Sequence, residues 1–163
     1  MAKKIAKTNA ARILDKEKIP YDILQYEPGD GLVDGVSVAA KIGYSDQTVH
    51  KTLVAVGHSK QHYVFVIPVS AELDLKKAAK AAGEKKIEMV PVKEILALTG
   101  YIRGGCSPIG MKKPFPTFVG AKAHALDEII VSAGKIGMQI KLSPEELLKV
   151  TSGQLADLTV GDE

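Results

Sequence analysis

The sequence predicts a mixed α/β fold, in which a mostly antiparallel or barrel-like β-sheet core is surrounded by helices. Short strand-like runs interleave irregularly with helical segments, and two pairs of these runs are separated by turn residues suited to hairpins. The composition, with 45% hydrophobic and 25% charged residues among 163, is typical of a globular protein. Since no low-complexity linker or internal repeat divides the sequence, we expect a single domain over residues 1–163.

Five segments combine apolar side chains at helical spacing with start or stop signals. These segments are residues 8–18, 36–43, 73–83, 91–100 and 145–153. Thr8 or Asn9 is the expected cap of the first helix, and Ser143 followed by Pro144 gives the last helix a strong start signature. Glycines end the second and third helices, because glycine readily adopts the left-handed backbone conformation that closes a helix.

Six short runs are rich in β-branched and aromatic residues, or alternate between apolar and polar side chains, as strands do. These runs are residues 21–27, 52–57, 63–68, 116–120, 127–134 and 138–143. The polar sequence HSKQH at 58–62 joins one pair, and a turn from Gly134 to Gly137 joins another. Both pairs are therefore predicted to form hairpins.

Residues 100–113, with the sequence GYIRGGCSPIGMKK, fit neither a helix nor a strand. Gly104 and Gly105 are adjacent, although paired glycines increase the conformational entropy that folding must overcome. The pair favours a place where the main chain comes close to a ligand. A tight turn without a ligand is the alternative.

The charge balance does not require a large nucleic-acid-binding surface. The 22 Lys and Arg residues exceed the 19 Asp and Glu residues by three, and most of the basic residues are lysines. Several lysines form pairs, which suit contacts with phosphates better than the reading of bases, although solvated faces are the alternative. The sequence has no apolar run of about 20 residues and no signal-peptide core in its first residues, and its one cysteine cannot form an internal disulfide. We therefore expect a cytoplasmic protein.

Common catalytic and metal-binding motifs do not occur in the sequence. It contains no HExxH, CxxC, GxSxG or P-loop motif, and the spacing of its four histidines does not fit a zinc site, so we expect neither a metal nor a cofactor. Cys106 has no histidine near it in sequence to act as a base, and a small packed thiol is the alternative to a nucleophile.

Two lysines have neighbours that suit a binding site. Lys51 precedes Thr52 at the start of an apolar strand, where its ammonium group suits a cleft edge, with an ordinary surface lysine as the alternative. The turn SAGK at 132–135 offers a hydroxyl group, free amides and the ammonium group of Lys135, which are features of an anion site.

Four blocks of the sequence, taken in order, resemble the YbaK/EbsC-type aminoacyl-tRNA deacylases, which are related to the editing domain of bacterial prolyl-tRNA synthetases. The blocks are VHKTLVAV, LDLKKAAKAAGEKKIEMV, TGYIRGGCSPIGMKK and IVSAGKIGMQIKLSPEELLKVT. The similarity extends from about residue 8 to residue 160 and implies the fold of that editing domain.

This resemblance implies a hydrolase that deacylates mischarged tRNA in trans, chiefly Cys-tRNA(Pro). In the family, the thiol of the substrate attacks its own ester carbonyl, so the protein positions the substrate and a thiolactone can be released. The implied partners are the aminoacylated 3′ end of tRNA and prolyl-tRNA synthetase in a ternary complex, without a membrane. The alternatives are a deacylase for another mischarged tRNA, such as Ala-tRNA(Pro), and a non-catalytic module that binds tRNA or the synthetase.

The resemblance also implies the residues of the site. The implied catalytic residues are Lys51, Thr52, Gly104, Gly105 and Ser132. The implied substrate-binding residues are Leu32, Asp34, Cys106, Ser107, Pro108, Gly134, Lys135 and Gln139. The chain departs from some members of the family at two places, because Gln139 replaces an aspartate and the early loop around Leu32 has no aromatic residue.

Overall fold

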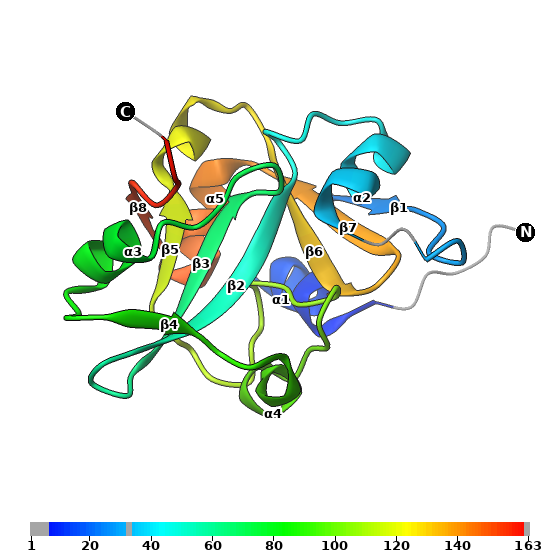
Figure 1. The fold of residues 1–163 in the computed structure, drawn as a ribbon. Helices are drawn as coiled ribbons and strands as arrows, with labels where there is room; N and C mark the ends of the chain where they lie inside the picture. Colours follow the sequence, from blue (N-terminus) through cyan, green and yellow to red (C-terminus); the bar gives the residue numbers. More distant parts are fainter. Residues whose placement is uncertain (1–6, 32–33, 162–163) are drawn as a thin grey trace, which may run out of the picture.

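Two β-sheets form the centre of the computed structural model, which describes residues 7–31 and 34–161 (Figure 1). One sheet has the strand order β1-β7-β6, and the other has the order β4-β2-β3-β5-β8. The strands are β1 (Asp22–Gln25), β2 (His50–Gly57), β3 (His62–Pro68), β4 (Ile87–Met89), β5 (Thr117–Gly120), β6 (Ile129–Lys135), β7 (Met138–Leu142) and β8 (Gln154–Ala156). The helices are α1 (Asn9–Lys16), α2 (Gly35–Ile42), α3 (Leu75–Ala82), α4 (Ile95–Thr99) and α5 (Pro144–Thr151), with short 3-10 helices at Val92–Glu94 and Ala121–Ala125. This arrangement confirms the predicted mixed α/β fold.

Helix boundaries follow the start and stop signals of the sequence. The Thr8 hydroxyl oxygen accepts a hydrogen bond from the third residue of α1, and the Ser143 hydroxyl oxygen accepts one from the amide of Glu146, at 3.1 Å. Gly43 and Gly83 follow α2 and α3 with φ angles of +76° and +69°, respectively. The prediction for 91–100 was only partly right, because that segment begins as a 3-10 helix before the short α4.

The strand pairing contains both expected and unexpected features. The predicted hairpins are present as the antiparallel pairs β2–β3 and β6–β7, and β1 pairs antiparallel with β7. However, β5 lies parallel to β3 and β8 lies parallel to β5, so the five-stranded sheet is mixed. The sequence analysis did not identify β4 or β8, since three residues are too few to show an alternating pattern.

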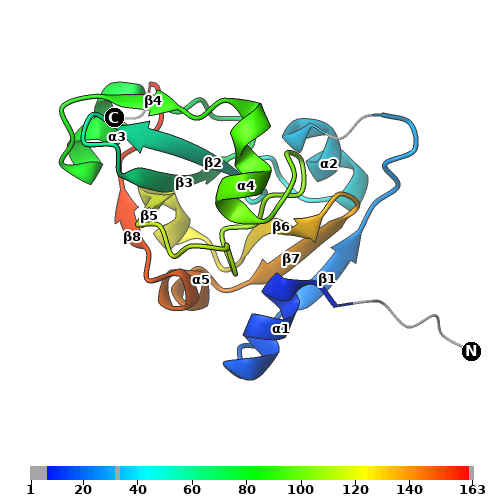
Figure 2. The ribbon, with the colours of Figure 1, turned by 90° about the horizontal axis from the view of Figure 1, so that it is seen from below.

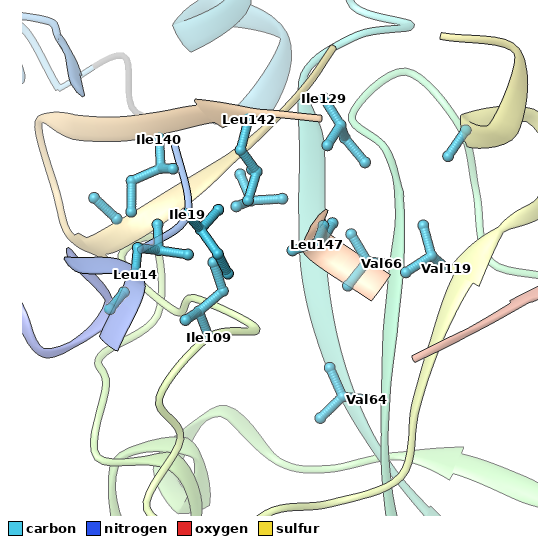
Figure 3. Close-up of a cluster of buried hydrophobic side chains, with 14 of the residues drawn as sticks. Leu14, Ile19, Val64, Val66, Ile109, Val119, Ile129, Ile140, Leu142 and Leu147 are labelled. Carbon is cyan, nitrogen blue, oxygen red and sulfur yellow. The ribbon is translucent and has the colours of Figure 1, made fainter. Parts of the chain in front are cut away.

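The main hydrophobic core lies between the two sheets (Figure 3). In Figure 2, β2 and β3 lie on one side of this space and β6 and β7 lie on the other. Val64 and Val66 of β3 enter the core between the sheets, whereas Phe65 and Ile67 enter a second cluster that includes residues of α3. Because successive side chains of β3 alternate between two buried faces, this strand reads as a continuous apolar run. None of the helices within 7–31 and 34–161 is long and apolar enough to cross a membrane.

A single β-bridge joins the two sheets at the start of β2. Val49 pairs in parallel with Ile130 of β6, and the Ile130 amide donates a hydrogen bond to the Thr48 carbonyl oxygen at 3.1 Å. The Val69 amide, just after β3, donates to the Val49 carbonyl oxygen at 2.9 Å. The first residues of β2 are therefore fixed between the end of β3 and the start of β6.

Candidate active site

A cavity of about 110 Å³ opens where the two sheets meet. Its walls come from the start of β2, the inner parts of β6 and β7, the start of α2 and the segment 100–113. Six residues implied by the resemblance line it, namely Lys51, Thr52, Gly104, Cys106, Ser132 and Gln139. The fold thus brings together side chains that are far apart in the sequence, at a size suited to a small chemical group.

Sequence reasoning missed the other residues that line this cavity. They are Tyr26, Gly35, Val38, Val49, His50 and Val69. Most of them look like ordinary strand or helix residues in the sequence, because no local motif marks them. His50 is the exception, since a histidine directly before Lys51 and Thr52 is a signal that could have been used.

The remaining implied residues do not line the cavity, and Leu32 lies outside the described residues. Asp34 is the N-cap of α2, where its carboxylate accepts hydrogen bonds from the amide and hydroxyl groups of Ser37. The Ser107 hydroxyl oxygen accepts a hydrogen bond from the amide of Ile109 and is fully buried. Pro108 lines a different cavity. Asp34 and Ser107 therefore serve local structure, and neither they nor Pro108 line this cavity.

Tyr101 holds the segment 100–113 against the β6–β7 hairpin. Its hydroxyl group donates a hydrogen bond to the carbonyl oxygen of Ile109 at 2.7 Å, which closes the segment on itself. Its ring lies so close to Gly134 that a Cβ built on this glycine would be 2.6 Å from Cε1 of the tyrosine. Gly134 was expected to bind substrate, but the structure shows that its lack of a side chain makes room for Tyr101.

The two adjacent glycines have different surroundings. Gly104 lines the cavity with φ at +87°, a conformation that glycine adopts most readily. Gly105 is buried and does not line the cavity, and a Cβ there would be 3.0 Å from the amide nitrogen of Ile136 and 3.2 Å from the backbone of Lys135. Gly104 therefore lies where a ligand in the cavity could meet its backbone, and its approach to a ligand stays a prediction, whereas Gly105 allows close packing of two backbone segments.

Lys51 brings a positive charge to the cavity wall. The side chain is partly buried, and this burial lowers the pKa of Lys51, an effect that the negative charge of Glu72 opposes. The neighbouring Thr52 hydroxyl oxygen is buried and has no hydrogen-bond partner among the described residues. The cavity wall thus includes both a cation and an unsatisfied hydroxyl group, which suit a polar ligand.

Cys106 is a poor nucleophile in this environment. Burial raises the pKa of the Cys106 thiol to about 11, although a weak contact with the Thr99 hydroxyl, 4.0 Å from the sulfur atom, acts in the opposite direction. The reactive form of cysteine is the thiolate, so this side chain stays protonated and unreactive at neutral pH. The structure favours the interpretation of a small packed thiol.

His50 is buried and uncharged at neutral pH. Only 3% of the residue is exposed, and burial lowers the pKa of His50 to about 4. Its Nδ1 lies 2.8 Å from the carbonyl oxygen of Thr48, and because a carbonyl can only accept, Nδ1 carries the proton. The Nε2 atom of this tautomer therefore has a free lone pair.

Three buried polar atoms on the cavity walls lack partners. The hydroxyl oxygens of Tyr26 and Thr52 and the Oε1 atom of Gln139 form no hydrogen bond within the described parts of the chain. Buried polar atoms are usually paired in native proteins, so three such atoms around one cavity indicate a place for a polar ligand. No group of three or more His, Cys, Asp or Glu residues suited to a metal ion occurs in 7–31 and 34–161.

The chain matches the model of the aminoacyl-tRNA editing domain family over residues 33–150. A protein of Enterococcus faecalis (strain ATCC 700802 / V583), which its name assigns as the Cys-tRNA(Pro)/Cys-tRNA(Cys) deacylase EbsC, is 50% identical over 161 residues, and the match covers 98% of both chains. A crystal structure assigned as a trans-editing enzyme for prolyl-tRNA synthetase is 25% identical, with a TM-score of 0.81 and coverage of 96% of this chain and 100% of the other. The crystal structure of a hypothetical protein is 22% identical, with a TM-score of 0.85 and coverage of 93% and 99%.

The substitution Gly105→Ala is expected to lower the free energy of unfolding by about 1–3 kcal/mol, because the new methyl group would press on the backbone of Lys135 and Ile136. Gly120→Ala is the matched control. Gly120 is also buried, at the end of β5, and its Cβ would meet only ordinary contacts of 3.7–3.9 Å. Urea unfolding of both variants measures the difference. Equal stability of the two variants would show that the backbone contact at Gly105 is not the reason for this glycine.

His50 is expected to make the folded state less stable as the pH falls from 6.5 toward 4. The unfolded chain binds a proton on this histidine at its ordinary pKa of 6.5, whereas the folded chain binds it only at about 4. More protons are therefore bound by the unfolded state within this window, and the stability lost there should be smaller in His50→Asn. Urea unfolding at pH 7, 6 and 5 measures the stability of wild type and of His50→Asn. The control is His124→Asn, which changes an exposed histidine. If the stability of His50→Asn falls with pH as steeply as that of wild type, the expectation is contradicted.

Proposed function

Because the chain belongs to the aminoacyl-tRNA editing domain family, we propose that it hydrolyses the cysteinyl ester of Cys-tRNA(Pro) in trans. Its family makes it an aminoacyl-tRNA deacylase, whose substrate is mischarged tRNA. The 50% identity to a relative named as a Cys-tRNA(Pro)/Cys-tRNA(Cys) deacylase, over 98% of both chains, is the observation that carries the proposal. A synthetase binds a smaller or similar amino acid only a few kcal/mol less tightly than the correct one, so a second hydrolytic step is needed for accuracy.

The proposed reaction uses the sulfur atom of the substrate. The cysteinyl thiol loses its proton to water, and the thiolate attacks the carbonyl carbon of its own ester. A carbon–sulfur bond forms, the bond from the carbonyl carbon to the ribose oxygen breaks, and that oxygen takes a proton from water. The thiolactone that leaves is opened by water, which gives free cysteine. No nucleophile of the protein takes part.

The chemistry of the cavity supports this mechanism. The protonated thiol of Cys106 offers no competing nucleophile at neutral pH. Lys51 supplies a positive charge for the developing oxyanion or a nearby phosphate, and Gly104 allows the backbone to approach the ester. We assign positioning of the ester to Lys51, Thr52, Gly104 and Ser132, the last of which lines the cavity while its hydroxyl oxygen accepts a hydrogen bond from the amide of Gly134.

We further propose that prolyl-tRNA synthetase joins the protein and the tRNA in a ternary complex in the cytoplasm, where tRNAs are charged. A related structure is assigned as a trans-editing enzyme for that synthetase, which supports this part of the proposal. The relative's name includes Cys-tRNA(Cys), so the identity of the tRNA is tested together with that of the amino acid.

A deacylation panel with catalytic amounts of protein tests the function. Cys-tRNA(Pro) and Cys-tRNA(Cys) should be turned over many times, with and without the synthetase. Ser-tRNA(Pro) should react poorly, because a hydroxyl group supplies almost no anion at neutral pH, and the side chain of Ala-tRNA(Pro) contains no nucleophile. Hydrolysis of Ala-tRNA(Pro) at the rate of Cys-tRNA(Pro), or binding without turnover, would overturn the proposal.

The substitution Lys51→Ala should reduce kcat/KM for Cys-tRNA(Pro) roughly 100-fold, since misplacement of a reacting group by about 1 Å has effects of this size. Lys51→Arg should also be poor, because a planar guanidinium does not replace a compact ammonium group. Lys149→Ala, which removes an exposed lysine of α5, is the control. Single-turnover deacylation rates of the three variants provide the measurement, and near-normal turnover by Lys51→Ala would remove this residue from the mechanism.

The substitution Cys106→Ser should keep most of the activity, because the reacting sulfur belongs to the substrate. With a pKa of about 11, roughly one Cys106 side chain in 10,000 is a thiolate at pH 7, so iodoacetamide should leave the enzyme active. Deacylation by Cys106→Ser and by alkylated wild-type protein provides the two measurements. Loss of activity in the folded serine variant would instead identify Cys106 as the nucleophile.

A further inference from the structure

Gln139 places a buried hydrogen-bond acceptor on the wall of the cavity. The residue lies on β7 with 6% of its surface exposed, and its Oε1 atom accepts no hydrogen bond from any residue within 7–31 and 34–161. A side-chain carbonyl oxygen can only accept, so a ligand in the cavity must supply a donor if this atom is to be paired. Buried polar atoms are rarely left without a partner in native proteins.

Among the reacting groups of an aminoacyl ester, only the α-amino group offers N–H donors. The ester oxygens are acceptors, and a thiol is a weak donor. Building on the proposed function, we propose that Gln139 Oε1 accepts a hydrogen bond from the α-amino group of the bound aminoacyl ester and that the cavity takes this amine in its uncharged form.

The two unpaired hydroxyl groups complete the match to an uncharged amine. Such an amine has two N–H donors and one lone pair, whereas an ammonium group has three donors and no lone pair. Tyr26 and Thr52 line the same cavity as Gln139, and their unpaired hydroxyls can each donate or accept, which is what the second N–H group and the lone pair require.

The charges around the cavity also favour the uncharged amine. Lys51 is the cation on its wall, and no Asp or Glu among the described residues lines it. The Asp34 carboxylate binds Ser37, and the charge of Glu72 acts on Lys51. Lys41 lies 5.8 Å from the centre of the Tyr26 ring, but it forms an ion pair with Asp30 at 2.6 Å, so the pair adds little net charge.

The titratable residues of the wall add no negative charge. His50 and Cys106 are both uncharged at neutral pH for the reasons given above, and the Tyr26 hydroxyl is one of the unpaired groups. A substrate ammonium would therefore enter a site that already holds a cation and offers no carboxylate, which disfavours the charged form.

The proposal is tested with a substrate that lacks only the amine. The two substrates are Cys-tRNA(Pro) and 3-mercaptopropionyl-tRNA(Pro), and the second keeps the thiol and the ester but has no amine. The activities of wild type and of Gln139→Met are measured with each substrate. We expect wild-type kcat/KM to fall at least about tenfold when the amine is absent. Gln139→Met should show a similar loss on Cys-tRNA(Pro) but little further loss on the substrate without the amine. Gln154→Met, on the exposed edge strand β8, controls for the substitution itself.

The ratio of kcat/KM for the two substrates reports the charge of the amine once each value is divided by the thiolate fraction of that substrate, measured by titration of its thiol, because the amine also changes the pKa of the thiol. For an uncharged amine the ratio should rise with pH through the pKa of the α-amino group, about 7.7–8.0 in peptides, and then level off. A ratio that falls with pH would show that the ammonium form binds, and would overturn that part of the proposal.

The outcomes separate this inference from the function on which it rests. If wild type hydrolyses both substrates equally well, Gln139 does not recognise the amine, although the deacylase function stands. If Gln139→Met is folded by circular dichroism and loses the same factor on both substrates, the residue has only a structural role and the proposal fails. If wild type hydrolyses neither substrate, the proposed function fails together with the inference.

Discussion

The carbonyl oxygen of Thr48 accepts two hydrogen bonds that connect the fold to the site. One comes from the backbone amide of Ile130 and joins the two sheets, and the other comes from Nδ1 of His50 and fixes the tautomer of that ring. Because both donors meet at one oxygen, the start of β2 cannot move relative to β6 without disturbing the imidazole. Lys51 and Thr52 follow directly in β2, so their positions in the cavity depend on the same junction.

The wall of the cavity that is formed by the segment 100–113 depends on close packing against the backbone of the β6–β7 hairpin rather than on regular secondary structure. The segment 100–113 is held by Tyr101, which packs on Gly134 of the β6–β7 hairpin, and by the close approach of Gly105 to Lys135 and Ile136. Gly105 and Gly134 therefore serve the packing of the protein against itself. Gly104 is the exception, since it faces the cavity, and a rigid support around it keeps its backbone in a defined place.

Much of the fold could be predicted from the sequence because its signals are local. The caps Thr8 and Ser143, the terminating glycines and the hairpin turns all act within a few residues. The parallel pairing of β5 with β3 and β8 could not be predicted, since it depends on contacts between distant segments.

The site was predictable only in part, and for the same reason. Lys51 with Thr52, Gly104, Cys106 and the SAGK turn that contains Ser132 stood out in the sequence itself, whereas Gln139 and the grouping of these residues into one site came from similarity to known sequences. Similarity could not distinguish Gly104, which faces the cavity, from Gly105, which packs on backbone, because the two glycines are chemically identical. Tyr26 was missed because its hydroxyl group reaches the cavity from the end of a strand that has no motif of its own.

The pairing of β1 with β7 also constrains when the protein becomes active during its synthesis. Asp22 faces Lys141 across this pair, so the three-stranded sheet needs residues from both ends of the chain. The β2–β3 hairpin can form early on the ribosome, but Ser132 and Gln139 reach their places only after most of the polypeptide has emerged. A nascent chain that ends before residue 139 lacks part of the cavity wall, so the proposed site is assembled only after residue 139 has emerged.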